Sequence, residues 1–226
     1  KCYSAHGIND FIICCGYKAE LVKEYFSNFG LYSSDITIDL KKKKIHYHKK
    51  KKNHYHKKKI EKWKITLIDT GLETQTGGRI KRVKDHLKDT FCLTYGDGLS
   101  DVDISKSISF HKKQKKLATM TTVQPAGRFG AVNIQNNLIQ DFKEKPIGDG
   151  GWINGGFFVL NKKILNYIKD DNSIWEQEPL MKIAQNKQLV SFKHDQFWHP
   201  MDTLRDKEYL EKLWNNKNCP WKIWND

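Results

Sequence analysis

Short apolar runs alternate with segments of helical periodicity along this chain, and the alternation leaves few folds open to it. Residues 11–15, Phe-Ile-Ile-Cys-Cys, form a continuous apolar run that ends at Gly16. Such a run is typical of a strand buried on both faces of a sheet. The apolar residues after it are spaced for one face of a helix: Leu21, Val22, Tyr25, Phe26 and Phe29. We therefore expect a strand followed by a helix, the repeating unit of α/β proteins.

The same alternation continues to the carboxyl end. Further apolar runs predict strands at residues 65–69, 91–95, 117–123, 152–160 and 189–192, and a hairpin at 129–134 and 138–142. Helices are expected after Thr76, Asp103, Asn161 and Ser173, of which the first three would act as caps, and around Leu210, Leu213 and Trp214. This order predicts a Rossmann-like, three-layer α/β fold in which helices flank a mixed, mostly parallel sheet. We expect one domain over residues 1–226, with 41–64 as an insertion or hairpin and 200–226 as a helical tail.

The net charge of +14 is concentrated in one tract. Residues 41–64 contain thirteen Lys and one Glu, which leaves only +2 for the rest of the chain and argues against nucleic acid as a partner of the fold. His46-Tyr47-His48 and His54-Tyr55-His56 would each place two imidazoles on one face of a strand, as a metal site requires. The alternatives are polyanion binding and a solvated hairpin whose lysines prevent edge pairing.

Cysteine usage and hydropathy indicate the setting of the protein. The five cysteines are odd in number and show no C-x-x-C spacing: Cys2, Cys14, Cys15, Cys92 and Cys219. This usage suits a reducing, cytoplasmic environment. No apolar run approaches the ~20 residues that span a bilayer, so we expect no membrane segment.

Two aspartates in distant segments have the surroundings of metal ligands. Asp97 follows an apolar run in Tyr95-Gly96-Asp97-Gly98, and Asp202 ends Pro200-Met201-Asp202. Open α/β sheets bind ligands at the carboxyl ends of their strands. Mg²⁺ takes one or two protein carboxylates and leaves its other positions to water and phosphates. We therefore predict that both aspartates hold Mg²⁺. The alternatives are that Asp97 is a turn residue and that Asp202 caps the last helix.

A second acidic pair competes for the same role. Asp101 and Asp103 form an Asp-x-Asp pair after a strand, which is how many sugar-nucleotide glycosyltransferases hold their metal. Asp103 also precedes a predicted helix that it would cap.

Other motifs carry side chains suited to a sugar phosphate. In Glu144-Lys145-Pro146, the lysine would neutralise a phosphate and the glutamate would accept hydroxyl hydrogen bonds. Asn154 precedes two glycines that let a ligand approach bare backbone. Trp175 would be a platform for a sugar ring, with Glu176 and Glu178 as acceptors. Simpler interpretations are a surface charge run for Glu144-Lys145-Pro146, a β-bulge at the two glycines after Asn154, and the first turn of a helix for Glu176.

Glycine-rich turns complete the set. Gly77-Gly78-Arg79 would offer amide donors and a guanidinium to a base or phosphate, and the turn at 127–130 would touch a ligand through its backbone. No Ser-His-Asp triad or nucleophilic cysteine stands out. A phosphate nucleophile, with a second pKa near ~6, is already ionised at neutral pH and needs no general base. Transfer from a nucleoside triphosphate then depends on alignment and charge neutralisation.

With these motifs the chain resembles the glucose-1-phosphate cytidylyltransferases, within the sugar-nucleotide nucleotidyltransferases. The similarity covers nearly the whole length and is strongest at residues 76–79, 94–98, 127–130, 144–146, 153–160, 175–181 and 200–206. The resemblance implies that CTP and α-D-glucose 1-phosphate are joined to CDP-glucose with release of pyrophosphate. It also implies an early place in the synthesis of dideoxy sugars for surface polysaccharides such as O-antigen.

The resemblance and the motifs together give a set of expected site residues. The catalytic residues are Asp97, Lys145 and Asp202, of which the two aspartates bind Mg²⁺. The nucleotide is expected at Thr76, Gly77, Gly78, Arg79 and Gly96. The sugar phosphate is expected at Gly130, Glu144, Lys145, Asn154, Trp175 and Glu178. A homo-oligomer without membrane contact is expected.

The chain departs from this family at two places. The family begins with a strand and a glycine-rich loop ending in Gly-Thr-Arg, followed by a Lys-Pro segment, and nothing here matches them. In addition, the Lys/His tract replaces an ordinary hairpin segment. Only residues 1–9 precede the first predicted strand, which needs neighbours on both edges. We therefore expect an amino-terminal segment before Lys1, and little or no activity without it. The alternatives are a non-catalytic sugar-phosphate or polyanion-binding protein and a glycosyltransferase that uses Asp101 and Asp103.

Overall fold

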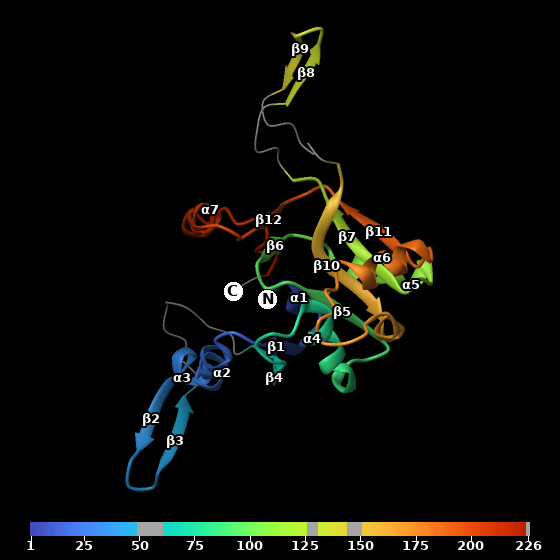
Figure 1. Cartoon of the computed structure of the whole chain (residues 1–226). Coiled ribbons are helices and arrows are strands. Elements are labelled where there is room, and N and C mark those ends of the chain that lie inside the picture. Colours follow the sequence, from blue (N-terminus) through green and yellow to red (C-terminus); the bar gives the residue numbers. More distant parts are fainter. Residues whose placement is uncertain (49–60, 126–130, 144–150, 225–226) are drawn as a thin grey trace.

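The computed structural model describes residues 1–48, 61–125, 131–143 and 151–224. Its largest sheet has the strand order β11–β7–β10–β5, with bounds Leu189–His194, Ala118–Val123, Ile153–Asn161 and Thr90–Thr94. β11 is parallel to β7, whereas β10 is antiparallel to both of its neighbours. The prediction of a mixed sheet is confirmed (Figure 1).

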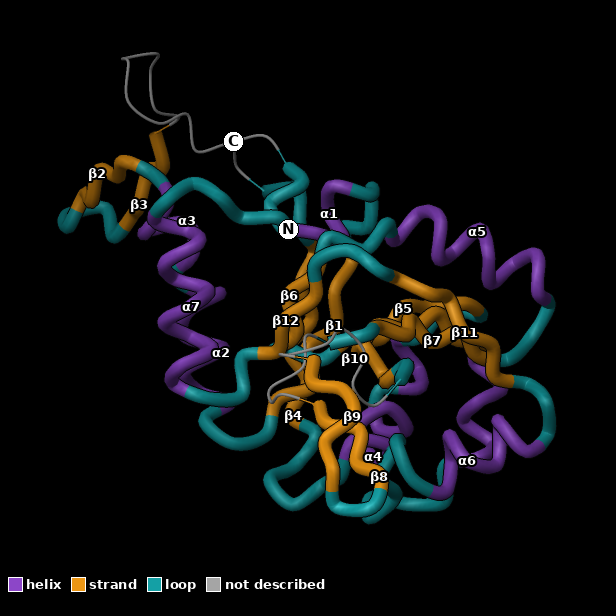
Figure 2. Tube along the Cα trace, turned by 90° about the horizontal axis from the view of Figure 1, so that it is seen from above, coloured by secondary structure: helices purple, strands orange, loops and turns teal. Residues whose placement is uncertain are grey.

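Helices cover both faces of this sheet. α5 (Ile104–Gln114) lies on one face and α6 (Glu178–Gln185) on the other (Figure 2). β10 serves both layers, because successive residues of a strand point to opposite faces. Phe157 packs in a cluster with the start of α5, and Phe158 packs in the larger core cluster with α6. The result is the helix–sheet–helix arrangement that the alternating sequence pattern predicted.

A second sheet pairs β1 (Asp10–Cys15) with β4 (Lys64–Asp69) in parallel. The apolar run at residues 11–15 predicted a strand buried on both faces, which is wrong: within β1 only Cys15 is buried. In the described part of the chain β1 pairs along one edge alone. Phe11 and Ile12 line a cavity of about 780 Å³ that they share with β5.

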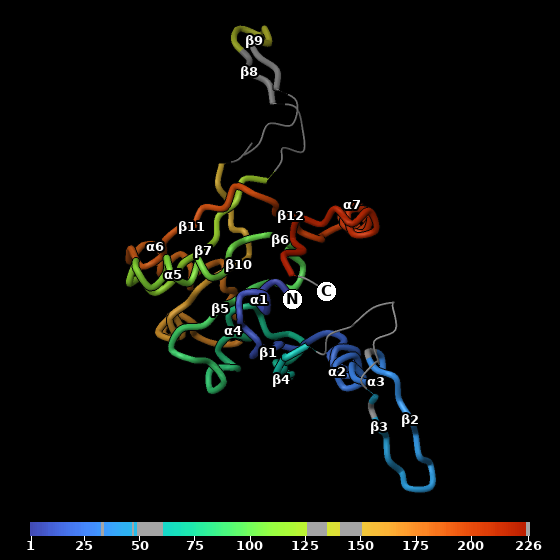
Figure 3. The backbone as a smooth tube through the Cα atoms, turned by 180° about the vertical axis from the view of Figure 1, so that it is seen from behind, coloured from blue at the N-terminus to red at the C-terminus, as the bar shows by residue number. Residues whose placement is uncertain are grey.

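The remaining elements complete the described part of the fold. The other helices are α1 (Cys2–Ala5), α2 (Ala19–Ser27), α3 (Phe29–Ser33), α4 (Thr76–Arg82), η1 (Lys84–His86), η2 (Lys162–Tyr167) and α7 (Leu204–Asn215). Two antiparallel pairs are hairpins, β2 (Asp35–Asp39) with β3 (Lys44–His48) and β8 (Ala131–Gln135) with β9 (Leu138–Lys143). The first projects from the body of the protein (Figures 1 and 3). A third pair joins β6 (Gly98–Ser100) to β12 (Trp198–Pro200). No helix in the described ranges combines the length and apolar character that crossing a membrane demands.

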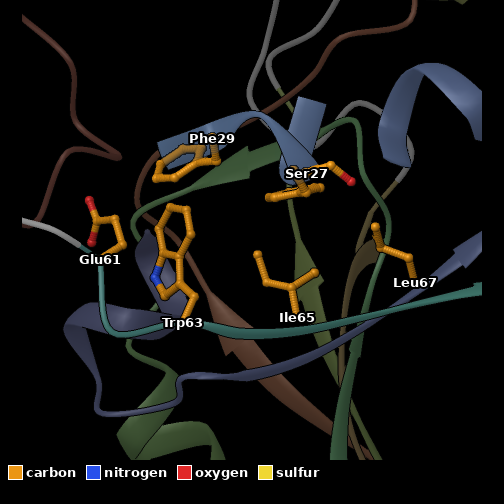
Figure 4. A pocket seen from close by; sticks show the side chains of 7 residues that line it. Ser27, Phe29, Glu61, Trp63, Ile65 and Leu67 are labelled. Atoms are coloured by element: carbon orange, nitrogen blue, oxygen red, sulfur yellow. The ribbon is translucent and has the colours of Figure 1, made fainter. Parts of the chain in front are cut away.

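A small pocket lies between α2, α3 and β4. It measures about 330 Å³, and Phe29, Trp63 and Ile65 line it (Figure 4). Its one charged group, Glu61, pairs with Lys1 at 2.7 Å. None of the residues expected to bind substrate lines this pocket, so it is separate from the site described next.

Candidate active site

Asp97 and Asp202 are attached to neighbouring strands of a short antiparallel ladder. β6 follows Asp97 directly, and β12 ends two residues before Asp202. Gly98 lies opposite Pro200, and the amide of Met201 donates a hydrogen bond to the carbonyl oxygen of Asp97 at 2.8 Å. Both aspartates are exposed. The structure therefore brings together the two distant segments that the sequence analysis expected to meet.

Asp202 is not the cap of the last helix. The hydroxyl of Thr203 accepts the amide of Asp206 at 3.2 Å, and the carboxylate of Asp206 accepts the amide of Thr203 at 3.0 Å. This is a complete capping box, and it satisfies the start of α7. The carboxylate of Asp202 is thus left without the structural role that was its alternative.

One member of the competing acidic pair has a structural role. The carboxylate of Asp103 accepts the amide of Lys106 at 2.9 Å and caps α5, as the sequence predicted. Oδ1 of Asp101 lies 3.0 Å from Nε2 of His194 but is buried and accepts no hydrogen bond from the described residues. The cap favours a structural role over metal binding for Asp103.

A pair of carboxylates, and not a larger cluster, is what the site offers a metal. Across the ranges that the structure describes, no group of three or more His, Cys, Asp or Glu side chains is arranged to hold a metal ion. Mg²⁺ usually keeps waters and takes its other ligands from substrate phosphates. The exposed carboxylates of Asp97 and Asp202 are of the kind that such an ion takes from a protein.

The expected nucleotide-binding segment at the start of α4 is clamped to the loop before α6. The amides of Gly77 and Gly78 both donate to the carbonyl of Ser173, at 2.9 and 3.2 Å. A methyl group on Gly78 would lie 2.5 Å from the backbone of Asp171. Close packing alone requires glycine here. The two amides were expected as free donors for a phosphate, but they are already used inside the protein.

Thr76 and Arg79 also make internal contacts. The guanidinium of Arg79 donates to the hydroxyl of Thr70 at 2.7 Å and to the carbonyl of Cys15 at 3.2 Å, which joins α4 to the ends of β4 and β1. Thr76 was expected to cap α4, but it is the first helical residue, and its hydroxyl accepts the amide of Trp175 at 2.9 Å. The prediction of a threonine cap was wrong because the loop before α6 takes the hydroxyl.

Tyr95 adjoins the expected site residues, although the sequence pattern gave it no role. Its hydroxyl donates to the carboxylate of Glu176, which also accepts the hydroxyl of Thr76 at 2.7 Å. Burial, and then the neighbouring carboxylate, raise the pKa of Tyr95 above its ordinary value, so the phenol stays protonated. The only sequence signal was its position two residues before Asp97.

Asn154 and its glycines lie against Tyr95. The side-chain oxygen of Asn154 accepts the amide of Gly156 at 2.8 Å. Gly156 has a φ of +78°, and a methyl group there would lie 2.8 Å from the Tyr95 ring. The indole of Trp198 donates to the carbonyl of Gly155 at 2.8 Å, which ties β10 to β12. The expected sugar motif thus adjoins the expected metal ligands.

Trp175 and Glu178 lie in different surroundings from those expected. Trp175 is 0% exposed and belongs to the core cluster, so its ring offers no surface for a sugar to stack on. This corrects the prediction of a platform. Glu178 is exposed and pairs with Lys182 at 2.6 Å and Lys169 at 2.9 Å, and hydrogen bonds from these lysines lower its pKa to about 2.

Some expected residues cannot be placed in this geometry. Gly130, Glu144 and Lys145 lie outside the described residues, as do residues 49–60 of the Lys/His tract. The first His-x-His triplet lies in β3, where Nε2 of His48 is 2.8 Å from the hydroxyl of Thr37. This contact between β2 and β3 is what the hairpin interpretation of the tract predicts.

Two solved structures share this fold. The apo form of a UDP-glucose pyrophosphorylase matches with a TM-score of 0.64 at 14% identity, over 96% of this chain and 84% of the other. HddC from Yersinia pseudotuberculosis matches with a TM-score of 0.59 at 19% identity, over 92% of this chain and 80% of the other. At these identities the likeness concerns the fold alone.

Sequence relatives are much closer. The family model "Nucleotidyl transferase" matches residues 1–226. The glucose-1-phosphate cytidylyltransferase of Salmonella typhi is 51% identical over 226 residues, which cover 99% of this chain and 85% of the relative. A probable glucose-1-phosphate cytidylyltransferase of Bacillus subtilis (strain 168) is 37% identical over the same shares. These comparisons confirm the resemblance seen in the motifs: the chain belongs to the nucleotidyl transferase family and, within it, to the glucose-1-phosphate cytidylyltransferases.

Proposed function

We propose that this protein joins CTP and α-D-glucose 1-phosphate to CDP-glucose, with release of pyrophosphate. The observation that carries the proposal is the β6–β12 ladder, which brings the segments that carry Asp97 and Asp202 next to each other in a member of the cytidylyltransferase family. Asn154 adjoins this ladder through the contact between β10 and β12.

The chemistry needs few protein groups. A phosphate oxygen of glucose 1-phosphate forms a bond to the α-phosphorus of CTP, and the bond from that phosphorus to the bridging oxygen breaks, so that pyrophosphate leaves with the electron pair. The attacking phosphate is already ionised, so no general base is required. Magnesium, when bound, would neutralise the charge on the phosphates. Asp97 and Asp202 would hold it, and Lys145 would contact the sugar phosphate.

The protein's surroundings follow from other features. All five cysteines are free, which suits a reducing compartment such as the cytoplasm.

The β2–β3 hairpin exposes Ile36, Ile38 and Ile45, at 36%, 53% and 46% of their surfaces. A second copy of the chain would cover this face in a homo-oligomer. The product would serve the synthesis of dideoxy sugars for surface polysaccharides.

The test is an assay of the complete protein with MgCl₂, glucose 1-phosphate and one of CTP, UTP, GTP or dTTP. We expect CDP-glucose and pyrophosphate in equal amounts, with the highest rate for CTP. Absence of pyrophosphate with every nucleotide would reject the function. Transfer of glucose from added CDP-glucose to an acceptor would favour the glycosyltransferase alternative instead.

A further inference from the structure

The carboxylate of Glu176 binds two hydroxyl groups from distant parts of the chain. One oxygen accepts the hydroxyl of Tyr95, which lies 81 residues away. The other accepts the hydroxyl of Thr76, which lies 100 residues away, at 2.7 Å. Tyr95 directly follows β5, and Thr76 is the first residue of α4. Each carboxylate oxygen therefore serves a different element.

Both partners are fixed on their other sides. The hydroxyl of Thr76 also accepts the amide of Trp175 at 2.9 Å. The amide of Tyr95 donates to the carbonyl of Gly156 at 3.3 Å. The Tyr95 ring packs edge-on against Phe158, with 6.0 Å between the ring centroids. Tyr95 and Thr76 are each held in place by these other contacts. A carboxylate that binds both hydroxyls therefore sets the position of α4 relative to β5.

The two elements carry different parts of the site. Asp97, an expected metal ligand, comes two residues after Tyr95, whereas the segment from Thr76 to Arg79 is expected at the nucleotide. We propose that Glu176 is a positioning residue, which holds the start of α4 against the end of β5 and so fixes the nucleotide-binding segment relative to Asp97. This inference rests on the proposed function for the identity of the nucleotide.

The role requires a carboxylate and not an amide. Ionised glutamate offers only acceptors, and here two hydroxyl donors use both oxygens. A glutamine of the same shape has one acceptor oxygen and one NH₂ group, so one of the two hydroxyls would have to turn and accept a neutral hydrogen bond instead of donating to a charged oxygen. Glu176→Gln therefore weakens that link and keeps the volume of the side chain. Tyr95→Phe removes the hydroxyl that donates to Glu176 and keeps the ring against Phe158.

The experiment is a double-mutant cycle on Glu176→Gln and Tyr95→Phe in the complete protein. The dissociation constant of CTP with MgCl₂ is measured without sugar phosphate, and the KM values for CTP and glucose 1-phosphate are measured in the pyrophosphate assay. Glu73→Gln, an exposed carboxylate three residues before Thr76, is the matched control. Thermal unfolding midpoints confirm that each variant is folded.

We expect each single variant to weaken CTP binding about tenfold, as the loss of one charge-assisted hydrogen bond predicts. The double variant should also lose about tenfold, and not the ~100-fold of independent sites. Glu176→Gln should change the KM for glucose 1-phosphate by less than about twofold, and Glu73→Gln should behave as wild type. Additive effects, or unchanged CTP binding in Glu176→Gln, would overturn the inference. A wild type that makes no CDP-glucose but shows this coupling in CTP binding would reject the proposed function and support Glu176.

Discussion

The amide of Met201 donates to the carbonyl oxygen of Asp97 at 2.8 Å, across 104 positions of sequence. The bond extends the β6–β12 ladder by one step, so the segments that carry Asp97 and Asp202 lie next to each other. Since Asp202 is free of capping and both carboxylates are exposed, the pair is available to a cation that arrives with substrate.

Asp97→Asn and Asp202→Asn should each lower turnover at least ~100-fold, because each removes a charge that we propose holds the metal. The rate of pyrophosphate release at saturating CTP measures the effect. Asp103→Asn is the matched control, because its side chain caps α5 and asparagine caps equally well. Near-normal rates in Asp97→Asn or Asp202→Asn, or a large loss in Asp103→Asn, would contradict the assignment of the metal to Asp97 and Asp202.

Gly78→Ala should destabilise the protein by about 1–3 kcal/mol, because its methyl group would lie 2.5 Å from the backbone of Asp171. Gly96→Ala is the contrasting change, since no atom lies within 4 Å of that position. It should leave the free energy of unfolding within about 0.5 kcal/mol of wild type and lower turnover, because the methyl group would enter the space beside Asp97. Urea unfolding of both variants checks the contrast. Equal stability of the two would contradict the packing role of Gly78.

Trp175→Ala should cost about 3–5 kcal/mol of stability, because the ring is fully buried beside Phe158. A sugar platform would behave differently, with a raised KM for glucose 1-phosphate and a nearly unchanged free energy of unfolding. Trp152→Ala, where 38% of the residue is exposed, should cost clearly less stability than Trp175→Ala, because part of its surface already faces solvent. Chemical denaturation separates the two outcomes.

His111 should make stability depend on pH in the weakly acidic range. It is buried in α5, its Nδ1 lies 2.9 Å from the hydroxyl of Thr119, and burial lowers its pKa below the ordinary value. The folded state thus favours neutral imidazole, so its contribution is present above the unfolded pKa of about 6.5 and is lost as pH falls through the folded pKa. In His111→Gln the decline in stability below about pH 6.5 should be shallower. His86→Gln, at an exposed position, should keep the wild-type slope; the same slope in both variants would contradict the assignment.

Local patterns predicted what depends on neighbours in sequence. The alternation of apolar runs with helical periodicity gave the mixed sheet and its flanking helices, and Asp103 before an amphipathic segment gave the cap of α5. Asp97 and Asp202 were proposed together because each follows an apolar run, and strand ends of one sheet lie near one another.

Contacts between distant segments were not predictable from such patterns. Trp175 was expected at the surface because aromatic side chains often bind sugars. It is instead buried in the core, in one cluster with Leu180 and Ile183. Thr76 was expected as a cap because nothing local shows that the loop before α6 would take its hydroxyl. The pairing of Tyr95 with Glu176 has no signal in spacing, because it depends on how α4, β5 and that loop meet.

The most direct test of the site is the affinity of the protein–CTP complex for Mn²⁺, followed by the electron paramagnetic resonance signal of free Mn²⁺. We predict that the wild type holds the ion more tightly than CTP in solution does. Asp97→Asn and Asp202→Asn should each weaken this affinity by at least ~10-fold, because each removes one protein ligand. Wild-type affinity in either variant would show that the two carboxylates do not share one cation.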